Sequence, residues 1–225
     1  MKLILSGGGD AGQTKKLDEF FVSLIHGDRK VLYIPIAMKF KHNTKECLDW
    51  LKKCLNPFKV KDIKTLDNLN GKTFENIKGF DAIYIGGGNT FSLLKDLKES
   101  KFIGGLEKYS ENGIIYGGSA GAIILGKTIN MAGFGKDTDE NTVGLTNLGG
   151  LNLVYGFDIQ CHYENYQDKE LFSYIKKNKN KIIAIPEGAG LYVENRKMFV
   201  KGEGSIFVFN KEIKKEFKSN EEVTF

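Results

Sequence analysis

Short apolar runs of strand-forming residues alternate with amphipathic helical stretches along most of this chain. Val31–Ala37 and Asp81–Ile85 are two of the apolar runs, and Thr44–Leu55 carries apolar residues near helical spacing. Continuous apolar strands are typical of a sheet that is covered on both faces. The β-α-β-α order therefore predicts a three-layer α/β fold, in which a largely parallel sheet has helices on both faces.

The expected elements follow from these runs. We expect strands at residues 2–6, 31–37, 58–66, 81–85, 113–116, 157–161 and 181–185, and helices at about 14–26, 44–55, 74–78, 90–97, 103–110 and 169–177. The Gly-, Asn- and Thr-rich segment 126–156 predicts loops and a possible hairpin. Short apolar runs over 189–209 predict a C-terminal antiparallel meander. We expect residues 1–225 to form one domain.

The composition and the charge pattern argue against a nucleic-acid partner. Hydrophobic residues make up 41% of the chain and charged residues 27%, as in an ordinary soluble globular protein. Arg29 and Arg196 are the only arginines, so lysines supply most of the basic charge behind the net +5. The lysines alternate with acidic residues along the whole chain, which is typical of a solvated surface. We therefore expect no nucleic-acid partner.

The cysteines and the N-terminus bear on the cellular compartment. Cys47, Cys54 and Cys161 lack paired spacing, which indicates reduced thiols. The first apolar stretch is too short for a signal peptide, and no segment approaches the roughly 20 apolar residues of a membrane span. We expect a cytoplasmic protein with no membrane partner.

The segment GIIYGGSAGAIILG, residues 113–126, carries the sharpest chemical signal. Its G-x-S-x-G motif lies between a predicted strand and an apolar helical run, the context of a nucleophile elbow. Such a turn exposes the Ser119 hydroxyl at a helix N-terminus, where backbone amides favour developing negative charge. We predict Ser119 as a nucleophile. The alternative is a Gly-rich connection in which Ser119 only caps the helix.

A second Gly-rich turn, Gly86–Thr90, directly follows the predicted strand at 81–85. Its backbone amides are candidate oxyanion donors. The alternative, a phosphate-binding turn, is weaker because the segment has neither the Lys of a P-loop nor a complete G-x-G-x-x-G fingerprint. Gly7–Asp10 is a less specific segment of the same kind, and we interpret it as the turn after the first strand.

A serine nucleophile needs a base. His162 follows the strand predicted at 157–161, at the edge of the sheet where ligands of parallel sheets bind. It is therefore the favoured base, with a non-catalytic loop histidine as the alternative. His26 is interpreted as a residue at a helix C-terminus and His42 as part of a basic loop.

Glu187 is the favoured acid to orient this base. It follows the next predicted strand and lies between Pro186 and Gly188, which indicates a fixed, tight turn. Asp158 precedes His162 by an even spacing within one strand, so the two side chains can share a face. The alternatives to Glu187 are Asp158, Asp137 and Asp139.

Four segments in this order make the chain resemble the serine peptidase family of dipeptidase E (aspartyl dipeptidase) and cyanophycinase: YIGGGNTF, YGGSAGA, QCHYEN and AIPEGAGLYV. The resemblance covers most of the chain and implies a fold related to the class I glutamine amidotransferases, which is flavodoxin-like. Motif by motif, it implies Ser119 as nucleophile, His162 as base and Glu187 as acid. It also implies that the amides of Gly88 and Ala120 are the oxyanion donors.

The sequence departs from this family where the substrate side chain is expected to bind. In dipeptidase E, an Arg-bearing segment after the His is associated with specificity for an N-terminal Asp, and here that segment has no Arg. Lys169 or Lys176 offers a point charge but no bidentate contact, so the implied preference for Asp-X peptides lacks its usual residue. Candidate substrate contacts are Asn89, Tyr163, Glu164, Asn165 and the acidic loop Lys136–Asn141. Among these, the Glu164 carboxylate suits a free amino terminus.

We therefore expect a serine peptidase that hydrolyses short peptides through a Ser–His–Glu triad and an acyl-enzyme. We expect no cofactor and no metal, because the sequence has no H-E-x-x-H motif or Cys/His cluster. The expected assembly is a monomer or a homodimer. The alternatives are an amidase or esterase that uses the same triad, and a non-catalytic small-molecule binding module of the same fold.

Overall fold

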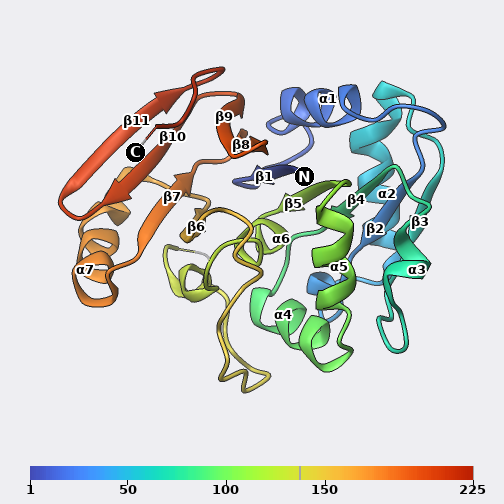
Figure 1. Ribbon diagram of the computed structural model, residues 1–225, viewed down its shortest axis with the longest axis horizontal. Helices are drawn as coiled ribbons and strands as arrows, with labels where there is room; N and C mark the ends of the chain where they lie inside the picture. Colours follow the sequence, from blue (N-terminus) through green and yellow to red (C-terminus); the bar gives the residue numbers. More distant parts are fainter. Residues whose placement is uncertain (137, 225) are drawn as a thin grey trace.

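Two β-sheets form the centre of the computed structural model, which describes residues 1–136 and 138–224 (Figure 1). The seven-stranded first sheet contains, in spatial order, β3 (Ile63–Thr65), β2 (Val31–Ile34), β4 (Ala82–Ile85), β5 (Ile114–Gly118), β1 (Lys2–Ser6), β8 (Ala189–Glu194) and β9 (Lys197–Gly202). The four-stranded second sheet contains β11 (Ile213–Lys218), β10 (Ser205–Asn210), β7 (Lys181–Ile185) and β6 (Phe157–Cys161).

Seven α-helices are assigned in the described residues: α1 (Lys15–Ser23), α2 (Thr44–Leu55), α3 (Phe74–Ile77), α4 (Thr90–Glu99), α5 (Ile103–Ser110), α6 (Ala120–Ile123) and α7 (Asp168–Asn178). Asn43 begins α2 with a capping box. The Asn43 side chain accepts from the Glu46 backbone amide, and the Glu46 side chain accepts from the Asn43 backbone amide. Every helix of residues 1–136 and 138–224 is too short or too polar to cross a membrane.

The first sheet is parallel from β3 to β1, and β8 and β9 extend it antiparallel. In this register Ser6 lies between Gly118 of β5 and Gly190 of β8. The central strands β2, β4 and β5 are buried along their whole length, as their continuous apolar sequences predict. The predicted α/β fold with a mostly parallel sheet is confirmed.

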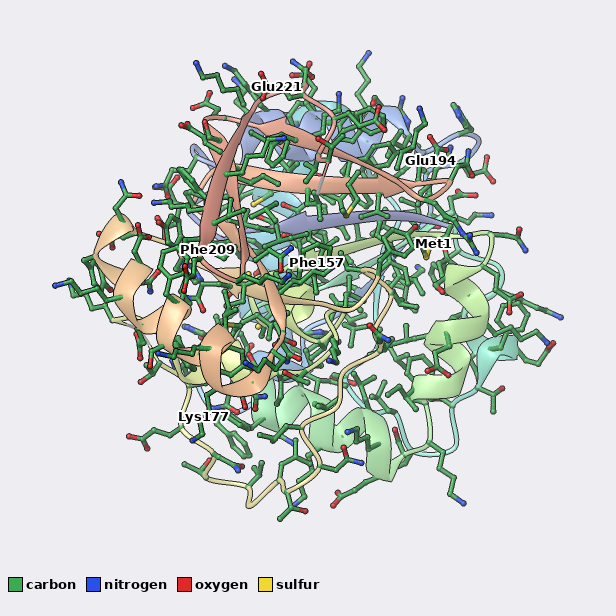
Figure 2. The ribbon with its side chains drawn as sticks, turned by 60° about the vertical axis from the view of Figure 1, so that its left-hand side comes forward. Met1, Phe157, Lys177, Glu194, Phe209 and Glu221 are labelled. Carbon is green, nitrogen blue, oxygen red and sulfur yellow. The ribbon has the colours of Figure 1, made fainter. Side chains whose placement is uncertain are left out.

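Helices cover both faces of the first sheet. On one face, Leu17 and Phe21 of α1 pack with Leu51 of α2, and on the other face Leu93 of α4 packs with Leu106 of α5. A third apolar cluster joins α7 to the second sheet. Figure 2 shows charged side chains such as those of Lys177, Glu194 and Glu221 at the periphery of the molecule.

The C-terminal tail forms antiparallel strands, but they are two separate hairpins and not one meander. The hairpin β8–β9 completes the first sheet, whereas β10–β11 completes the second sheet. Gly202 and Gly204, which join the hairpins, have φ angles of 80° and 79°, a conformation that favours glycine. The chain turns there from one sheet to the other. The strand β11 was not expected from the sequence, because only Phe217 of its residues is buried.

Several predicted boundaries change for local reasons. The strand expected at 31–37 ends at Ile34, because Pro35 has no N–H to continue the ladder, and a 3₁₀-helix over Ile36–Met38 follows. The strand expected at 58–66 is confined to β3. The segment 126–156 is loop, with a 3₁₀-helix at Asn130–Gly133 and one antiparallel bridge between Thr128 and Gly149.

The contact between α6 and β4 makes Gly121 indispensable for packing. A Cβ atom at Gly121 would lie 2.3 Å from the Ile85 carbonyl oxygen, whereas a Cβ at Gly104, in the first turn of α5, would meet nothing within 4 Å. We expect Gly121→Ala to lower the free energy of unfolding by about 1–3 kcal/mol through overpacking. The control Gly104→Ala should raise it by about 0.4–1 kcal/mol. Urea unfolding measures both, and equal stability of the two variants would contradict the packing.

Candidate active site

Ser119 occupies a strained turn between β5 and α6. Its φ and ψ angles are 47° and −109°, a region that costs a non-glycine residue about 1–3 kcal/mol. The Ser119 amide donates to the Ser6 carbonyl at 3.2 Å, and the Ser119 carbonyl accepts from the first turn of α6. A Cβ at Gly117 would lie 2.4 Å from the Gly121 carbonyl oxygen, so strand and helix meet at van der Waals distance. The geometry is that of the expected elbow.

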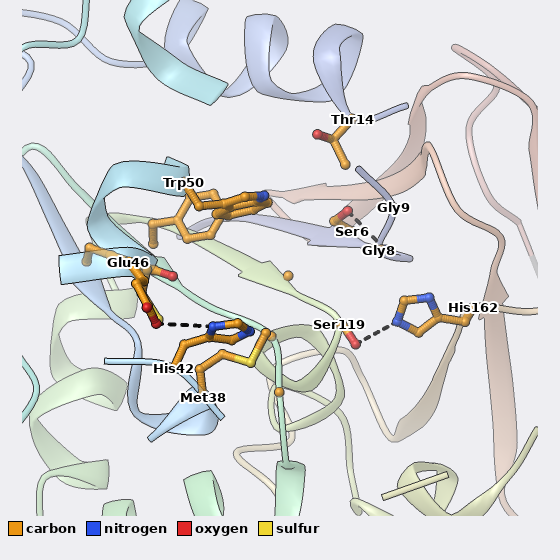
Figure 3. A pocket seen from close by; sticks show the side chains of 16 residues that line it. Ser6, Gly8, Gly9, Thr14, Met38, His42, Glu46, Trp50, Ser119 and His162 are labelled. Atoms are coloured by element: carbon orange, nitrogen blue, oxygen red, sulfur yellow. Dashed lines mark hydrogen bonds and ion pairs between the residues drawn. The ribbon is translucent and has the colours of Figure 1, made fainter. Parts of the chain in front are cut away.

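A chain of hydrogen bonds begins at the Ser119 hydroxyl. Ser119 Oγ lies 2.8 Å from His162 Nε2, and His162 Nδ1 lies 2.8 Å from Glu187 Oε1. Gln13 Nε2 donates to the second carboxylate oxygen, Glu187 Oε2, at 3.0 Å. Figure 3 shows the first of these contacts, with the imidazole facing the serine. Three segments distant in the sequence therefore bring one hydroxyl, one imidazole and one carboxylate into line.

The first Gly-rich turn supports the imidazole. The His162 amide donates to the Gly7 carbonyl at 2.8 Å, and His162 itself has a φ of 50°. A Cβ at Gly8, whose φ is 101°, would lie 2.2 Å from His162 Cε1. The sequence indicates this turn only as a connection after the first strand, but in the structure the His162 imidazole packs against it.

The Glu187 carboxylate is held in its ionised form. The hydrogen bond from His162 lowers the pKa of Glu187 below its usual value, Gln13 adds to this effect, and partial burial opposes it. Because the folded-state pKa is depressed, the stabilisation from this contact is present above the ordinary pKa of 4.5 and is lost as pH falls through the folded-state value. An ionised carboxylate at Nδ1 favours the tautomer whose Nε2 accepts from Ser119.

The other candidate acids have different partners. Asp158 is fully buried and accepts hydrogen bonds from Thr128, Tyr174 and Asn180. Asp139 accepts from both the amide and the hydroxyl of Thr90. Asp137 lies outside the described residues. Of the described carboxylates, Glu187 is the one that contacts His162.

The turn Gly86–Thr90 lies against Ser119. A Cβ at Gly87 would be 3.3 Å from Ser119 Cβ, and one at Gly88, whose φ is 128°, would be 2.3 Å from the Ala37 carbonyl oxygen. In residues 1–136 and 138–224, neither the Gly88 amide nor the Ala120 amide donates a hydrogen bond to another residue. Both donors are therefore available to a ligand beside Ser119.

The four predicted substrate contacts differ in their surroundings. Asn89 caps α4 by accepting from the Ser92 amide at 2.8 Å, and it donates to the Glu140 carbonyl at 2.9 Å. Tyr163 is buried, and its hydroxyl lies within hydrogen-bond distance of two acceptors, Asn165 Oδ1 and Asp168 Oδ1. Glu164 is exposed. The structure thus uses the Asn89, Tyr163 and Asn165 side chains within the protein. Glu164 begins the 3₁₀-helix Asn165–Gln167 with a capping box to Gln167, and no ion pair involves it among the described residues.

Two cavities meet at Ser119, and both are lined by Gly88, Ser119 and His162. One, of about 460 Å³, is the polar cavity, whose further lining includes Lys41, Lys136, Asp139, Gln160, Glu164, Tyr166, Gln167 and Glu187. The other, of about 610 Å³, is the apolar cavity, whose further lining includes Tyr33, Met38, Cys47, Trp50 and Tyr84, with Thr14, His42 and Glu46 (Figure 3). Lys169 and Lys176 line a different cavity, beside α7.

The apolar cavity is the feature that the sequence analysis missed. His42, interpreted as part of a basic loop, lies at this cavity with its Nδ1 3.3 Å from Glu46 Oε2. Glu46 and Trp50 are one helical turn apart on α2, so they share a face of that helix. This spacing is visible in the sequence, but it does not reveal that the face is turned toward Ser119.

A buried carboxylate, Asp18 of α1, lies among the aromatic residues behind the apolar cavity. Its side chain is 1% exposed and accepts a hydrogen bond from Thr14, a residue of the cavity lining. Burial raises the pKa of Asp18 from 3.8 to about 7. The folded protein therefore retains a proton that the unfolded chain releases, and its stability falls as pH rises between these two values.

We expect Asp18→Asn to remove this pH dependence. The amide is neutral at every pH and retains an acceptor for Thr14. The variant should therefore be more stable than the parent above pH 7 by up to about 4 kcal/mol, since one pKa unit corresponds to about 1.4 kcal/mol. The difference should be small near pH 4. Urea unfolding at both pH values measures it, with Glu19→Gln, an exposed carboxylate on the same helix, as control. A gain that does not grow with pH would contradict the prediction.

Comparison with known proteins relates the chain to a family of peptidases. The model of peptidase family S51 matches residues 3–201. A peptidase E of Nostoc sp. (strain PCC 7120) is 30% identical over 146 residues, which are 60% of this chain and 58% of the relative. An uncharacterized peptidase of Listeria monocytogenes is 32% identical over 137 residues, or 58% of this chain and 65% of that protein. The matched segment thus spans about three fifths of the length of these curated relatives.

Two crystal structures resemble the whole fold. A Listeria monocytogenes protein described as a candidate peptidase E superposes with a TM-score of 0.68 at 25% identity, covering 89% of this chain and 98% of that one. A peptidase from an acI-B1 actinobacterium superposes with a TM-score of 0.76 over 100% of this chain and 96% of its own, and at 19% identity it shows the fold alone.

Proposed function

The chain belongs to peptidase family S51, and we propose that it hydrolyses short peptides as a serine-type peptidase, with Ser119 as nucleophile, His162 as base and Glu187 as orienting acid. Family membership agrees with the class expected from the sequence. The observation that carries the proposal is the unbroken chain of hydrogen bonds from Ser119 Oγ through the imidazole to Glu187, at distances of 2.8 Å in both contacts. Such an arrangement activates a serine regardless of chain order.

In the acylation step, His162 Nε2 takes the hydroxyl proton as Ser119 Oγ attacks the peptide carbonyl carbon. The resulting imidazolium is stabilised by the ionised Glu187 carboxylate at Nδ1. The oxyanion of the tetrahedral intermediate accepts from the Gly88 and Ala120 amides, which have no acceptor among the described residues. Collapse of the intermediate breaks the C–N bond, and the leaving amine takes its proton from Nε2.

In the deacylation step the same groups act on water. His162 takes a proton from a water molecule, the hydroxide adds to the acyl carbon, and the second tetrahedral intermediate is held by the same two amides. Its collapse releases the carboxylic acid and returns the proton to Ser119 Oγ. Each turnover therefore consumes one peptide and one water.

Short substrates suit the two cavities on either side of Ser119. We propose that the amino terminus of the peptide binds in the polar cavity, where the exposed Glu164 carboxylate can pair with an ammonium group. The lysines in this cavity are Lys41 and Lys136, which can attract an acidic side chain only as point charges. Point charges of this kind do not impose a strict requirement for Asp at the first position.

Replacement of the nucleophile tests the reaction. We expect Ser119→Ala to lower kcat on cleaved dipeptides by roughly 10⁴- to 10⁶-fold, and to abolish covalent labelling by a fluorophosphonate probe. Ser173→Ala, at an exposed serine of α7, is the matched control and should retain both. Wild-type protein that cleaves no dipeptide and forms no adduct would overturn the proposal. Cleavage of aryl esters but not of peptides would assign the triad to an esterase.

Replacement of the acid tests the roles of the carboxylates. We expect Glu187→Gln to lower kcat by roughly 10²- to 10⁴-fold, because the amide no longer stabilises the imidazolium. Asp158→Asn should leave kcat near the wild-type value while lowering the free energy of unfolding, since Asp158 bonds only to structural partners. Steady-state kinetics and urea unfolding separate the two effects. The reverse result would assign the acid to Asp158.

A further inference from the structure

One wall of the apolar cavity is built of aromatic rings that contact one another. Trp50 meets Tyr84 edge-on with ring centroids 6.4 Å apart, and Tyr33 meets Tyr84 in the same manner at 5.7 Å. Behind them, Tyr84 stacks on Tyr116 at 4.3 Å. Packing from behind by fully buried Phe21 fixes these rings in place. The wall is therefore a preformed surface for apolar side chains.

Trp50 is incompletely covered within this wall. It is the only tryptophan of the chain, and 39% of its surface remains exposed. Figure 3 shows Trp50 and Met38 on the side of the cavity opposite to Ser119 and His162, so that a ligand bound between them contacts both groups. Burying a tryptophan and a thioether against an aromatic or branched aliphatic group is favourable, because it removes apolar surface from water.

The charges around the two cavities decide which end of a peptide enters each one. Both cavities share Gly88, Ser119 and His162, so a scissile bond held at these residues places one neighbouring residue on each side. An amino-terminal ammonium needs a carboxylate, and Glu164 lies in the polar cavity. In the apolar cavity the Glu46 carboxylate is already paired with His42. An ammonium bound beside Trp50 and Met38 would lose hydration, and the one carboxylate among the described residues of this lining, that of Glu46, already contacts His42 Nδ1 and the Asn43 amide.

We propose that the apolar cavity binds the residue on the leaving-group side of the scissile bond, and that this residue has an aromatic or large aliphatic side chain. The inference rests on the proposed function and specifies its substrate class: short peptides whose second residue is apolar. Cleavage of the C–N bond then releases an apolar amino acid, whose amine takes the proton from His162 Nε2. The volume of about 610 Å³ falls within the roughly 300–1,000 Å³ of small-molecule pockets.

Two mirrored dipeptide series test this assignment. The first varies the second residue, as Ala-Phe, Ala-Leu, Ala-Gly, Ala-Lys and Ala-Glu, and the second varies the first residue, as Phe-Ala, Leu-Ala and Gly-Ala. We expect kcat/KM to be at least tenfold higher for Ala-Phe and Ala-Leu than for the other members of the first series. A preference of this size is expected from a side chain in an apolar pocket. The second series should show no such preference for apolar residues.

Substitutions in the wall of the apolar cavity test whether the preference for an apolar second residue arises there. Trp50→Ala should reduce the ratio of kcat/KM for Ala-Phe over Ala-Gly by about tenfold, and Trp50→Phe should retain most of it. Tyr166→Ala, which truncates an exposed aromatic residue of the polar cavity, is the matched control and should leave this ratio unchanged. If Trp50→Ala fails to fold, Met38→Ala tests the same wall from its other side.

Binding without turnover gives a second readout. In Ser119→Ala, titration with Ala-Phe should change the fluorescence of Trp50, the sole indole, until the site is saturated. The Kd for Ala-Gly should be at least tenfold higher than the Kd for Ala-Phe. Cleavage of all dipeptides at similar rates, or a preference that follows the first residue, would overturn the inference and leave the proposed function standing. Absence of any dipeptide cleavage by the wild type would instead refute the proposed function. Absence of a fluorescence response to Ala-Phe would also count against the apolar site.

Discussion

The carboxyl end of β1 holds the two ends of the site together. The Ser6 carbonyl accepts from the Ser119 amide, and the next carbonyl, that of Gly7, accepts from the His162 amide at 2.8 Å. These backbone contacts join the loop after β5, in the first sheet, to the loop after β6, in the second sheet. The distance between the hydroxyl and the imidazole is therefore set by main-chain geometry at a strand end, which is more rigid than a contact between two flexible side chains.

Glycine makes this approach possible at both ends. At the serine, any Cβ on Gly117 or Gly121 would collide with backbone, and at the histidine a Cβ on Gly8 would collide with the imidazole ring. The backbone strain at Ser119 and His162, which have φ angles of 47° and 50°, persists because the surrounding strands leave no alternative path. Close packing, strain and reactive geometry are thus consequences of the same few residues.

Much of the site was predictable because parallel strands end at a common edge. Ser119, His162 and Glu187 each follow a predicted strand, and that placement sufficed to bring the three into one hypothesis. The division into two sheets was not predictable, since it depends on the φ angles of Gly202 and Gly204 and on pairing between residues far apart in sequence. The apolar cavity was not predictable either, because its lining comes from helix faces and loops, whose orientation is decided only by packing.

The bond between Gln13 and Glu187 has a consequence for biosynthesis. It ties the turn that leads into α1 to a carboxylate in the last quarter of the chain, whereas Ser119 lies near the middle. During translation Ser119 emerges well before His162 and Glu187, and β8 must insert beside β1 before the hydrogen-bonded chain can form. In a nascent or truncated chain the Ser119 hydroxyl therefore lacks these partners, and under the proposed mechanism hydrolysis begins only once the ribosome has delivered most of the polypeptide.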